Sequence, residues 1–275
     1  QEAGVPQGVD ELAEAMFEAG KPLASRVMVN RIWQYHFGHG LVRTPSNFGK
    51  LGEKPSHPEL LDWLASAFEE SGWSIKHLHR LIISSATYQR SSGFNQDNFD
   101  SDGDNRLLWR MSPRRMEIEA WRDSLLAVTG ELDRTIGGKP TDKIFDVKRR
   151  TLYTTISRNG DRFASDEFLR LFDFPSPSST APKRVTSTVP QQYLFMLNSP
   201  FMIARAKALS ERLQKEEKDD KARIELAYAL LYGRPPTKDE IQIGLGFLSG
   251  KEGKIPRFQQ YAQVLLSAHE FIQVR

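Results

Sequence analysis

At 275 residues the chain is long enough to bury a substantial hydrophobic core, as one large domain or as two smaller ones. Its composition, 39% hydrophobic and 27% charged, is that of an ordinary globular protein and excludes a disordered or fibrous chain. The 38 basic and 35 acidic side chains nearly balance, so charge does not favour nucleic acid as a partner, and the absence of cysteine excludes disulfides, thiolate metal sites and haem attachment through CxxCH.

The first third of the chain has the apolar spacing of four helices. Residues 9–17 and 23–37 fit the first two, and we expect Pro22 to separate them because proline cannot donate the backbone hydrogen bond of a helix interior. Ser56 opens the third helix, with a Glu three residues later in the pattern of a capping box. Ser74 is placed to cap the fourth. Between the second and third helices lies a loop rich in Gly and Pro.

The middle of the chain predicts two helices and one strand. Residues 112–128 begin with Ser-Pro, a favourable helix start, and residues 166–172 also have a helical pattern. Residues 149–158 (RRTLYTTISR) alternate apolar and polar side chains, which is typical of a strand. Because an isolated strand leaves its backbone unpaired, we expect it to pair with a short neighbour near residues 183–187.

The last third returns to helices, at residues 190–197, 200–215, 224–232 and 237–248 and from Pro256 onward. Thr188, Ser199 and Thr237 are placed to cap three of them. No apolar run approaches the roughly 20 residues of a membrane span, so no span is expected.

These patterns together predict a mainly α, multi-helix globular domain with about ten helices and a small central β element. We expect an N-terminal helical part over residues 1–135, a strand-and-loop segment over residues 136–190 and a C-terminal helical part over residues 191–275. The three parts are expected to form one compact domain.

Several long motifs occur in a fixed order along the chain. They are RVMVNRIWQYHFGHGLVRTPSNFG, HPELLDWLA, GWSIKHLHRLIISSATYQ, NRLLWRMSPRRMEIEAWRDSLL, RRTLYTTISR, LFDFPSPS, VTSTVPQQYLFMLNSPF and YGRPPTKDE. In this combination the sequence resembles the planctomycete-specific domain-of-unknown-function family 1553, over nearly the whole chain. One departure is near the end, where the family's usual LNSNEF stands here as LLSAHEF and places His269 where an Asn is common.

The resemblance implies a setting but no reaction. Such domains usually form the C-terminal part of large exported proteins that also carry a second uncharacterised domain and often a cytochrome c domain. It therefore implies an extracytoplasmic location, periplasmic or secreted, with the other domains of the same protein as partners. No cofactor is expected in this chain, and haem would belong to another domain of the full-length protein.

Four polar residues of the first third are candidates for catalysis. His36 or His57 could act as a general base that Asp62 or Glu59 orients, with Arg31 beside them, or two histidines could share a metal. The structural alternative is that these histidines bond helix ends and neighbouring side chains. His79 lies two residues from His77 in a helix, where the two side chains point away from each other, so these two are not expected to bind a metal jointly.

A second candidate set is basic and could bind an anion such as a sulfated or carboxylated glycan. Its members are Arg43, Asn47, Arg114, Arg115, Arg149 and Arg150. The structural alternative is that these arginines support loops by bonding carbonyls and carboxylates.

The leading functional hypothesis is a helical module of an exported, cytochrome-associated protein that acts in assembly or ligand binding. The alternative is an enzyme that acts on polysaccharide, with the cluster of Arg31, His36, His57 and Asp62. A third hypothesis, nucleic-acid binding, has the least support from the charge and from the implied compartment.

Overall fold

The computed structural model describes residues 8–159 and 163–274. These residues contain twelve α-helices and two short strands, which confirms the mainly α fold. Contacts between Cα atoms divide the chain into two compact units, one that ends at Arg114 and one that begins at Arg115. Each unit is described by itself below. No helix in the described part of the chain is long and apolar enough to cross a membrane.

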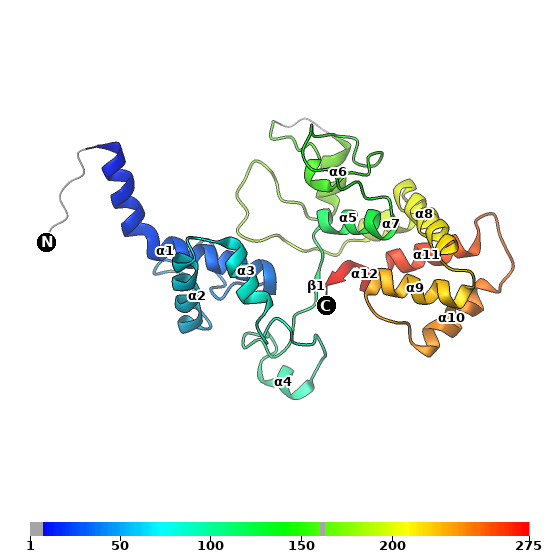
Figure 1. Ribbon diagram of the computed structural model, residues 1–275, viewed down its shortest axis with the longest axis horizontal. Coiled ribbons are helices and arrows are strands. Elements are labelled where there is room, and N and C mark those ends of the chain that lie inside the picture. Colours follow the sequence, from blue (N-terminus) through cyan, green and yellow to red (C-terminus); the bar gives the residue numbers. More distant parts are fainter. Residues whose placement is uncertain (1–7, 160–162, 275) are drawn as a thin grey trace. The chain divides into compact units, whose positions relative to one another are not determined.

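The first unit is built from four helices: α1 (Val9–Phe37), α2 (Pro58–Glu70), α3 (Ile75–Ile83) and α4 (Gln96–Ser101). The C-terminal half of α1 packs with α2 and α3, while its first turns extend away from them (Figure 1). The core side chains come from α1 to α3 and from the loops that follow; they are Val29, Ile32, Trp33, Phe37, Leu41, Val42, Leu61, Leu64, Phe68, Leu78, Ile82 and Met111.

Helix α1 corrects the prediction of two helices separated at Pro22. A single helix continues through this proline. Proline deprives the carbonyl of residue 18 of its helical partner, but residues 11–19 are exposed, so water can satisfy that carbonyl. The break was wrong because proline in an exposed helical turn bends or weakens a helix without ending it.

The loop after α1 is held by Asn30, which is 0% exposed. Its amide donates to the Val42 carbonyl (3.0 Å), and its carbonyl oxygen accepts from the Val42 N–H (2.8 Å). Gly40 passes so close to this side chain that a Cβ would lie 2.5 Å from the Asn30 amide nitrogen. The GHG sequence therefore lets the loop close against α1, and this contact fixes the backbone next to Arg43.

The cap of α2 also differs from the prediction. His57, not Ser56, is the N-cap residue, and the Ser56 hydroxyl lies 3.0 Å from the His57 Nδ1 atom. Pro58 occupies the first turn, where its missing N–H costs no helical bond. The prediction for Ser74 is confirmed, since its hydroxyl accepts from the His77 N–H at 3.3 Å.

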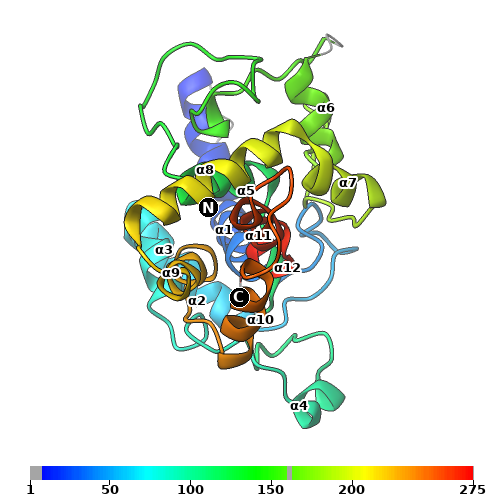
Figure 2. The same cartoon turned by 90° about the vertical axis from the view of Figure 1, so that its right-hand side faces the viewer.

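The second unit contains the remaining elements. They are β1 (Arg114–Arg115), which begins one residue before it, α5 (Ile118–Val128), the 3-10 helix η1 (Thr151–Tyr153), α6 (Ala164–Leu171), α7 (Pro190–Asn198), α8 (Pro200–Glu216), α9 (Asp220–Tyr232), α10 (Lys238–Leu248), α11 (Arg257–Ser267), α12 (His269–Ile272) and β2 (Gln273–Val274). Helix α8 packs against α5, α7, α9 and α11 (Figure 2). The side chains between these helices form a second hydrophobic core, which includes Trp121, Leu125, Met202, Leu209, Ile224 and Leu266.

Helix starts in this unit follow their sequence signals in part. Ser199 and Thr237 cap α8 and α10 as predicted, and Thr237 forms the expected capping box with Glu240. Helix α7 instead has Val189, not Thr188, at its N-cap. The Ser-Pro start was also wrong, because the chain is extended at β1 and α5 begins only at Ile118.

The predicted strand over residues 149–158 is wrong. The segment forms η1, and Leu152 in it is 70% exposed. Its backbone forms two isolated bridges, of Arg149 with Asp133 and of Thr154 with Thr141. Between them the Asp123 carboxylate of α5 accepts from both the N–H and the hydroxyl of Thr151, at 2.7 Å each. The small β element pairs β1 with β2 instead, with a hydrogen bond of 2.7 Å from the Met116 N–H to the Ile272 carbonyl. Residues 183–187 form no strand.

The buried Arg122 stabilises the irregular backbone of residues 144–149, which leads into η1. Its guanidinium group donates to the carbonyls of Ile144, Val147 and Arg149, at 2.6, 2.7 and 2.9 Å. Burial lowers the pKa of Arg122 to about 10, which leaves the group protonated at neutral pH. One cation thus satisfies three carbonyls that a strand partner would otherwise have to pair.

Candidate functional site

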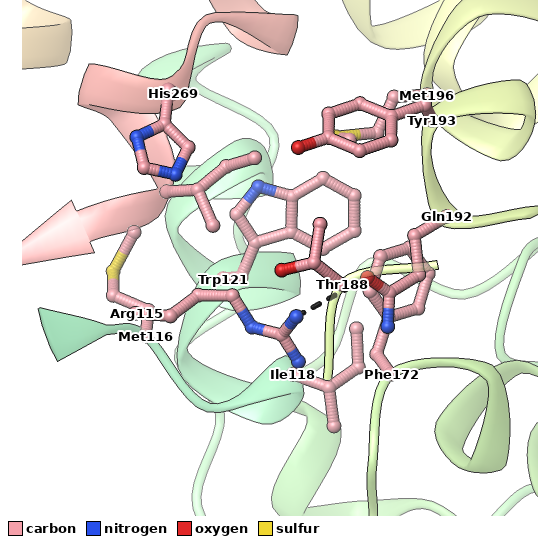
Figure 3. Close-up of a pocket in the computed structure, with 11 residues that line it drawn as sticks. Arg115, Met116, Ile118, Trp121, Phe172, Thr188, Gln192, Tyr193, Met196 and His269 are labelled. Atoms are coloured by element: carbon pink, nitrogen blue, oxygen red, sulfur yellow. Dashed lines mark hydrogen bonds between the residues drawn. The ribbon is translucent and has the colours of Figure 1, made fainter. Parts of the chain in front are cut away.

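The second unit contains a pocket between the first turn of α5, the first turns of α7 and helix α12 (Figure 3). We call it the second-unit pocket. Its walls are mainly apolar and aromatic, with a few polar groups: Arg115, Met116, Ile118, Trp121, Phe172, Thr188, Gln192, Tyr193, Met196, His269 and Ile272. Concave apolar surfaces with a small number of polar groups are typical of sites for small molecules.

Trp121 contributes a buried polar group to this pocket. The residue is 2% exposed, and its indole Nε1 atom has no hydrogen-bond acceptor among the described residues. In Figure 3 this nitrogen lies on the side of the ring that faces His269 and the Tyr193 hydroxyl. A buried N–H without an acceptor costs about 1–3 kcal/mol, so the position calls for a reason beyond packing.

The charge of Arg115 is balanced inside the protein. Its guanidinium group donates to the Asp173 carboxylate and to the Ser187 carbonyl, and to the Gln192 side-chain oxygen at 3.2 Å (Figure 3). Burial raises the pKa of Asp173, but the hydrogen bonds from Ser187 and Arg115 outweigh this and hold it below its usual value. Among the described residues that line the pocket, Arg115 is the only Lys, Arg, Asp or Glu. Because Asp173 neutralises Arg115, this arginine adds no net positive charge to the pocket.

The local fold at the end of α6 places Asp173 for this role. The N–H of Asp173 bonds to the Arg170 carbonyl, and the N–H of Phe174 bonds to the Leu169 carbonyl. This is the pattern of a helix C-terminus with a left-handed residue after the cap. Asp173 occupies the left-handed position, with φ of 66°. Asp and Asn tolerate this conformation better than most residues, and here it turns the carboxylate towards Ser187 and Arg115.

His269 reaches the pocket from α12, whose position is fixed by Arg234. The guanidinium group of Arg234 bonds both oxygens of Glu270 and both oxygens of Glu240, at 2.8 to 2.9 Å. The hydrogen bonds that Glu240 accepts, chiefly from Arg234 and then from Thr237, lower its pKa to about 2. The YGRPPTKDE motif therefore connects the end of α9 with α10 and α12 and holds His269 at the pocket.

The predicted catalytic residues of the first unit make separate contacts. The His36 Nε2 atom lies 2.7 Å from Nδ1 of His79 on α3, the His57 ring contacts Ser56, and Asp62 forms an ion pair with Arg26. Arg31 is exposed on α1. Burial, followed by the charges of His79 and Arg114, lowers the pKa of His36. A catalytic role for the four predicted residues stays a prediction.

The predicted anion-binding residues are each engaged with the protein. Arg43 contacts Asp104, the Asn47 carboxamide oxygen accepts from the Gly49 N–H at 3.1 Å, and Arg114 donates to the Tyr35 carbonyl. In the second unit Arg149 donates to the Gly137 carbonyl and stacks 4.1 Å from the Tyr153 ring centroid, and Arg150 lies 3.5 Å from Asp123. Most of these are the contacts expected of arginines that support loops, and a ligand role for the set stays a prediction.

No group of three or more His, Cys, Asp or Glu side chains that could hold a metal ion occurs in residues 8–159 and 163–274. The His36–His79 pair is therefore a hydrogen-bonded pair with no further acidic or imidazole ligand gathered at it.

Sequence reasoning did not identify the second-unit pocket. Trp121 has the spacing of a core residue, and nothing in the neighbouring sequence indicates that its N–H lacks an acceptor. Asp173 lies in the LFDFPSPS motif and His79 in an HxH pair, but their partners are 58 and 43 residues away in sequence. Of the lining residues, the sequence had singled out Arg115, as a candidate for anion binding, and His269, as a departure from the family's usual ending.

The fold defines a mainly α-helical protein of two units, with an apolar pocket in the second. A family model described as PSD1, protein of unknown function (DUF1553), matches residues 10–248, and the chain belongs to this family. No curated protein and no solved structure matches the chain.

Proposed function

We propose that this chain is a ligand-binding module whose second-unit pocket takes a small, uncharged, mostly apolar molecule that presents a hydrogen-bond acceptor. The observation that carries the proposal is the buried Trp121 indole N–H, which faces the pocket and has no acceptor in the part of the chain that the structure describes. A ligand oxygen at this N–H would remove the cost of the unpaired donor and so favour binding.

The lining supports an apolar ligand body. Ile118, Phe172 and Met196 are almost fully buried and leave only non-polar surface towards the pocket. Two of the lining residues are methionines, whose flexible thioether side chains adapt to irregular shapes. The polar atoms of Thr188 and Tyr193 can orient the polar end of the ligand.

The charge balance supports an uncharged ligand. A carboxylate would have to compete with Asp173, which already accepts bonds from Arg115 and from the N–H and hydroxyl of Ser187. Transferring a charged group from water into a mostly apolar pocket costs free energy unless an unpaired group of opposite charge is there to bind it. A ketone, ester or ether oxygen meets the indole donor without that cost.

Three probes of similar shape test the proposal by calorimetry. Acetophenone has a carbonyl acceptor, ethylbenzene lacks one, and benzoate is charged. We expect acetophenone to bind about tenfold more tightly than ethylbenzene, the equivalent of one hydrogen bond, and more tightly than benzoate. Equal binding of acetophenone and ethylbenzene, or no binding of any of the three, would contradict the proposal.

A matched pair of variants locates the binding site. Tyr193→Ala removes a lining residue from α7, and Leu194→Ala removes its exposed neighbour, which does not line the pocket. Acetophenone should bind Tyr193→Ala several-fold more weakly and Leu194→Ala as it binds the wild type. If both variants bind alike, the probe lies elsewhere.

The family resemblance suggests the setting of this module. We propose that the chain is part of a larger exported protein in which a cytochrome c domain would carry haem, and that assembly with the neighbouring domains is a second role. This setting is a proposal that rests on the resemblance alone.

A further inference from the structure

The first unit contains a pocket of different chemistry. It lies between the end of α1, the loop that follows it and residues 104–112, and we call it the first-unit pocket. Trp33 and Phe37, which stack with ring centroids 4.3 Å apart, contribute its apolar side. Two guanidinium groups, from Arg43 and Arg106, also line it, with Asp104 as the one Asp or Glu among the described residues that do so.

Arg43 is held in place but weakly neutralised. The Asn30 clamp on Val42 fixes the backbone beside it, and its side chain is only 22% exposed. Its guanidinium group donates to the Asp104 main-chain carbonyl at 3.1 Å, whereas the Asp104 carboxylate is 3.5 Å away. The Asp104 side chain is 76% exposed. A contact between a guanidinium group and such a solvated carboxylate contributes little and exchanges readily.

Two further donors border the same space. Arg106 lies 3.9 Å from the Glu53 carboxylate, with both side chains more than 40% exposed, so this ion pair is also loose. The Ser112 hydroxyl accepts from the buried Asn105 amide at 2.8 Å, which leaves its own hydrogen to be donated. Asn105 adopts a left-handed conformation, φ of 51°, to make this bond.

We propose that the first-unit pocket binds the carboxylate or sulfate group of a small ligand through Arg43 and Arg106, and that Asp104 competes with the ligand for Arg43. The planar fork of a guanidinium group matches both oxyanions. Trp33 and Phe37 offer a non-polar side for the part of the ligand that carries the anion. When no ligand is bound, the Asp104 carboxylate occupies the vicinity of Arg43.

Titrations with sodium sulfate and sodium acetate, each against sodium chloride at equal ionic strength, test this site. The readout is the NMR shift of the Arg43 and Arg106 side-chain N–H resonances, which report on this unit alone. We expect at least one of the two oxyanions to move both residues, and the comparison of sulfate with acetate shows which group the pocket prefers. If neither anion moves them beyond the chloride control, the proposal is wrong.

Variants separate a built site from general attraction of anions. Arg43→Gln should weaken binding of the preferred ion by about tenfold, the loss of a bidentate contact, while Arg80→Gln, an exposed arginine on α3, should leave it unchanged. Asp104→Asn should strengthen binding by about two- to fivefold, because it removes the competing exposed ion pair. Equal affinity in Arg43→Gln and wild type, or weaker binding in Asp104→Asn, would overturn the proposal. Thermal unfolding of each variant shows whether a loss reflects misfolding.

Discussion

Asn30 pairs with both backbone groups of Val42, through hydrogen bonds of 3.0 and 2.8 Å, across 12 residues of sequence. The Asn30 side chain thereby pairs with the backbone of the loop in the way that the backbone of a neighbouring strand does in a sheet. Since both residues are buried, neither backbone group of Val42 can turn to water instead.

We therefore expect Asn30→Ala to lower the free energy of unfolding by about 2–4 kcal/mol, because two buried backbone groups lose their partners. Urea denaturation of the full chain measures the change. Asn47→Ala is the control: its side chain makes one exposed hydrogen bond, to the Gly49 N–H, and should cost about 0.5–1 kcal/mol. Equal losses in the two variants would mean that the clamp on Val42 contributes no more than a surface turn.

The local sequence predicts features that depend on near neighbours. Ser74, Ser199 and Thr237 cap their helices as expected because a cap needs only a side chain and the N–H group three residues later. The mainly α fold follows from apolar spacing for the same reason.

Features that depend on distant partners were not predictable. Thr151 reads as part of a strand, but its N–H and hydroxyl bond to Asp123, 28 residues earlier, so tertiary contacts override its β-propensity. The prediction of a helix break at Pro22 was wrong because the free-energy cost of a proline within a helix depends on whether that turn is exposed to water, which the local pattern does not reveal. The unpaired Trp121 N–H likewise depends on what α7 and α12 leave open around it.

The His36–His79 pair makes a prediction about pH. Burial is the main reason that the pKa of His36 lies below its usual 6.5, followed by His79 and Arg114. The unfolded chain then takes up the proton at a higher pH than the folded chain, so stability is present above about pH 6.5 and is lost as the pH falls below it.

Replacing His36 by Gln should therefore make the urea midpoint less dependent on pH between 7 and 5 than in the wild type. His77→Gln is the matched control, since His77 is exposed on the same helix as His79 and two residues from it. An unchanged pH slope in His36→Gln would show that another group titrates in this range.

The ion pair beside the second-unit pocket makes a prediction about ligand charge. Asp173→Asn keeps a side chain that tolerates the left-handed backbone but removes the counter-charge of Arg115. Because Arg115 is then unpaired next to the pocket, we expect benzoate to bind at least about tenfold more tightly than it binds the wild type. Calorimetry with acetophenone on the same variant checks that the pocket is intact. If benzoate affinity does not change, the charge of Arg115 does not select the ligand.

The NMR resonance of the Trp121 indole N–H reports whether this group donates a hydrogen bond to the ligand. The chain has five tryptophans, so the other four indole resonances are internal controls, and the spectrum of Trp121→Phe assigns the signal. We predict that acetophenone moves the Trp121 resonance downfield and leaves the other four in place, while ethylbenzene causes no such downfield shift. A Trp121 resonance that stays in place while acetophenone binds, or that moves equally with both compounds, would show that the Trp121 N–H does not donate to the ligand.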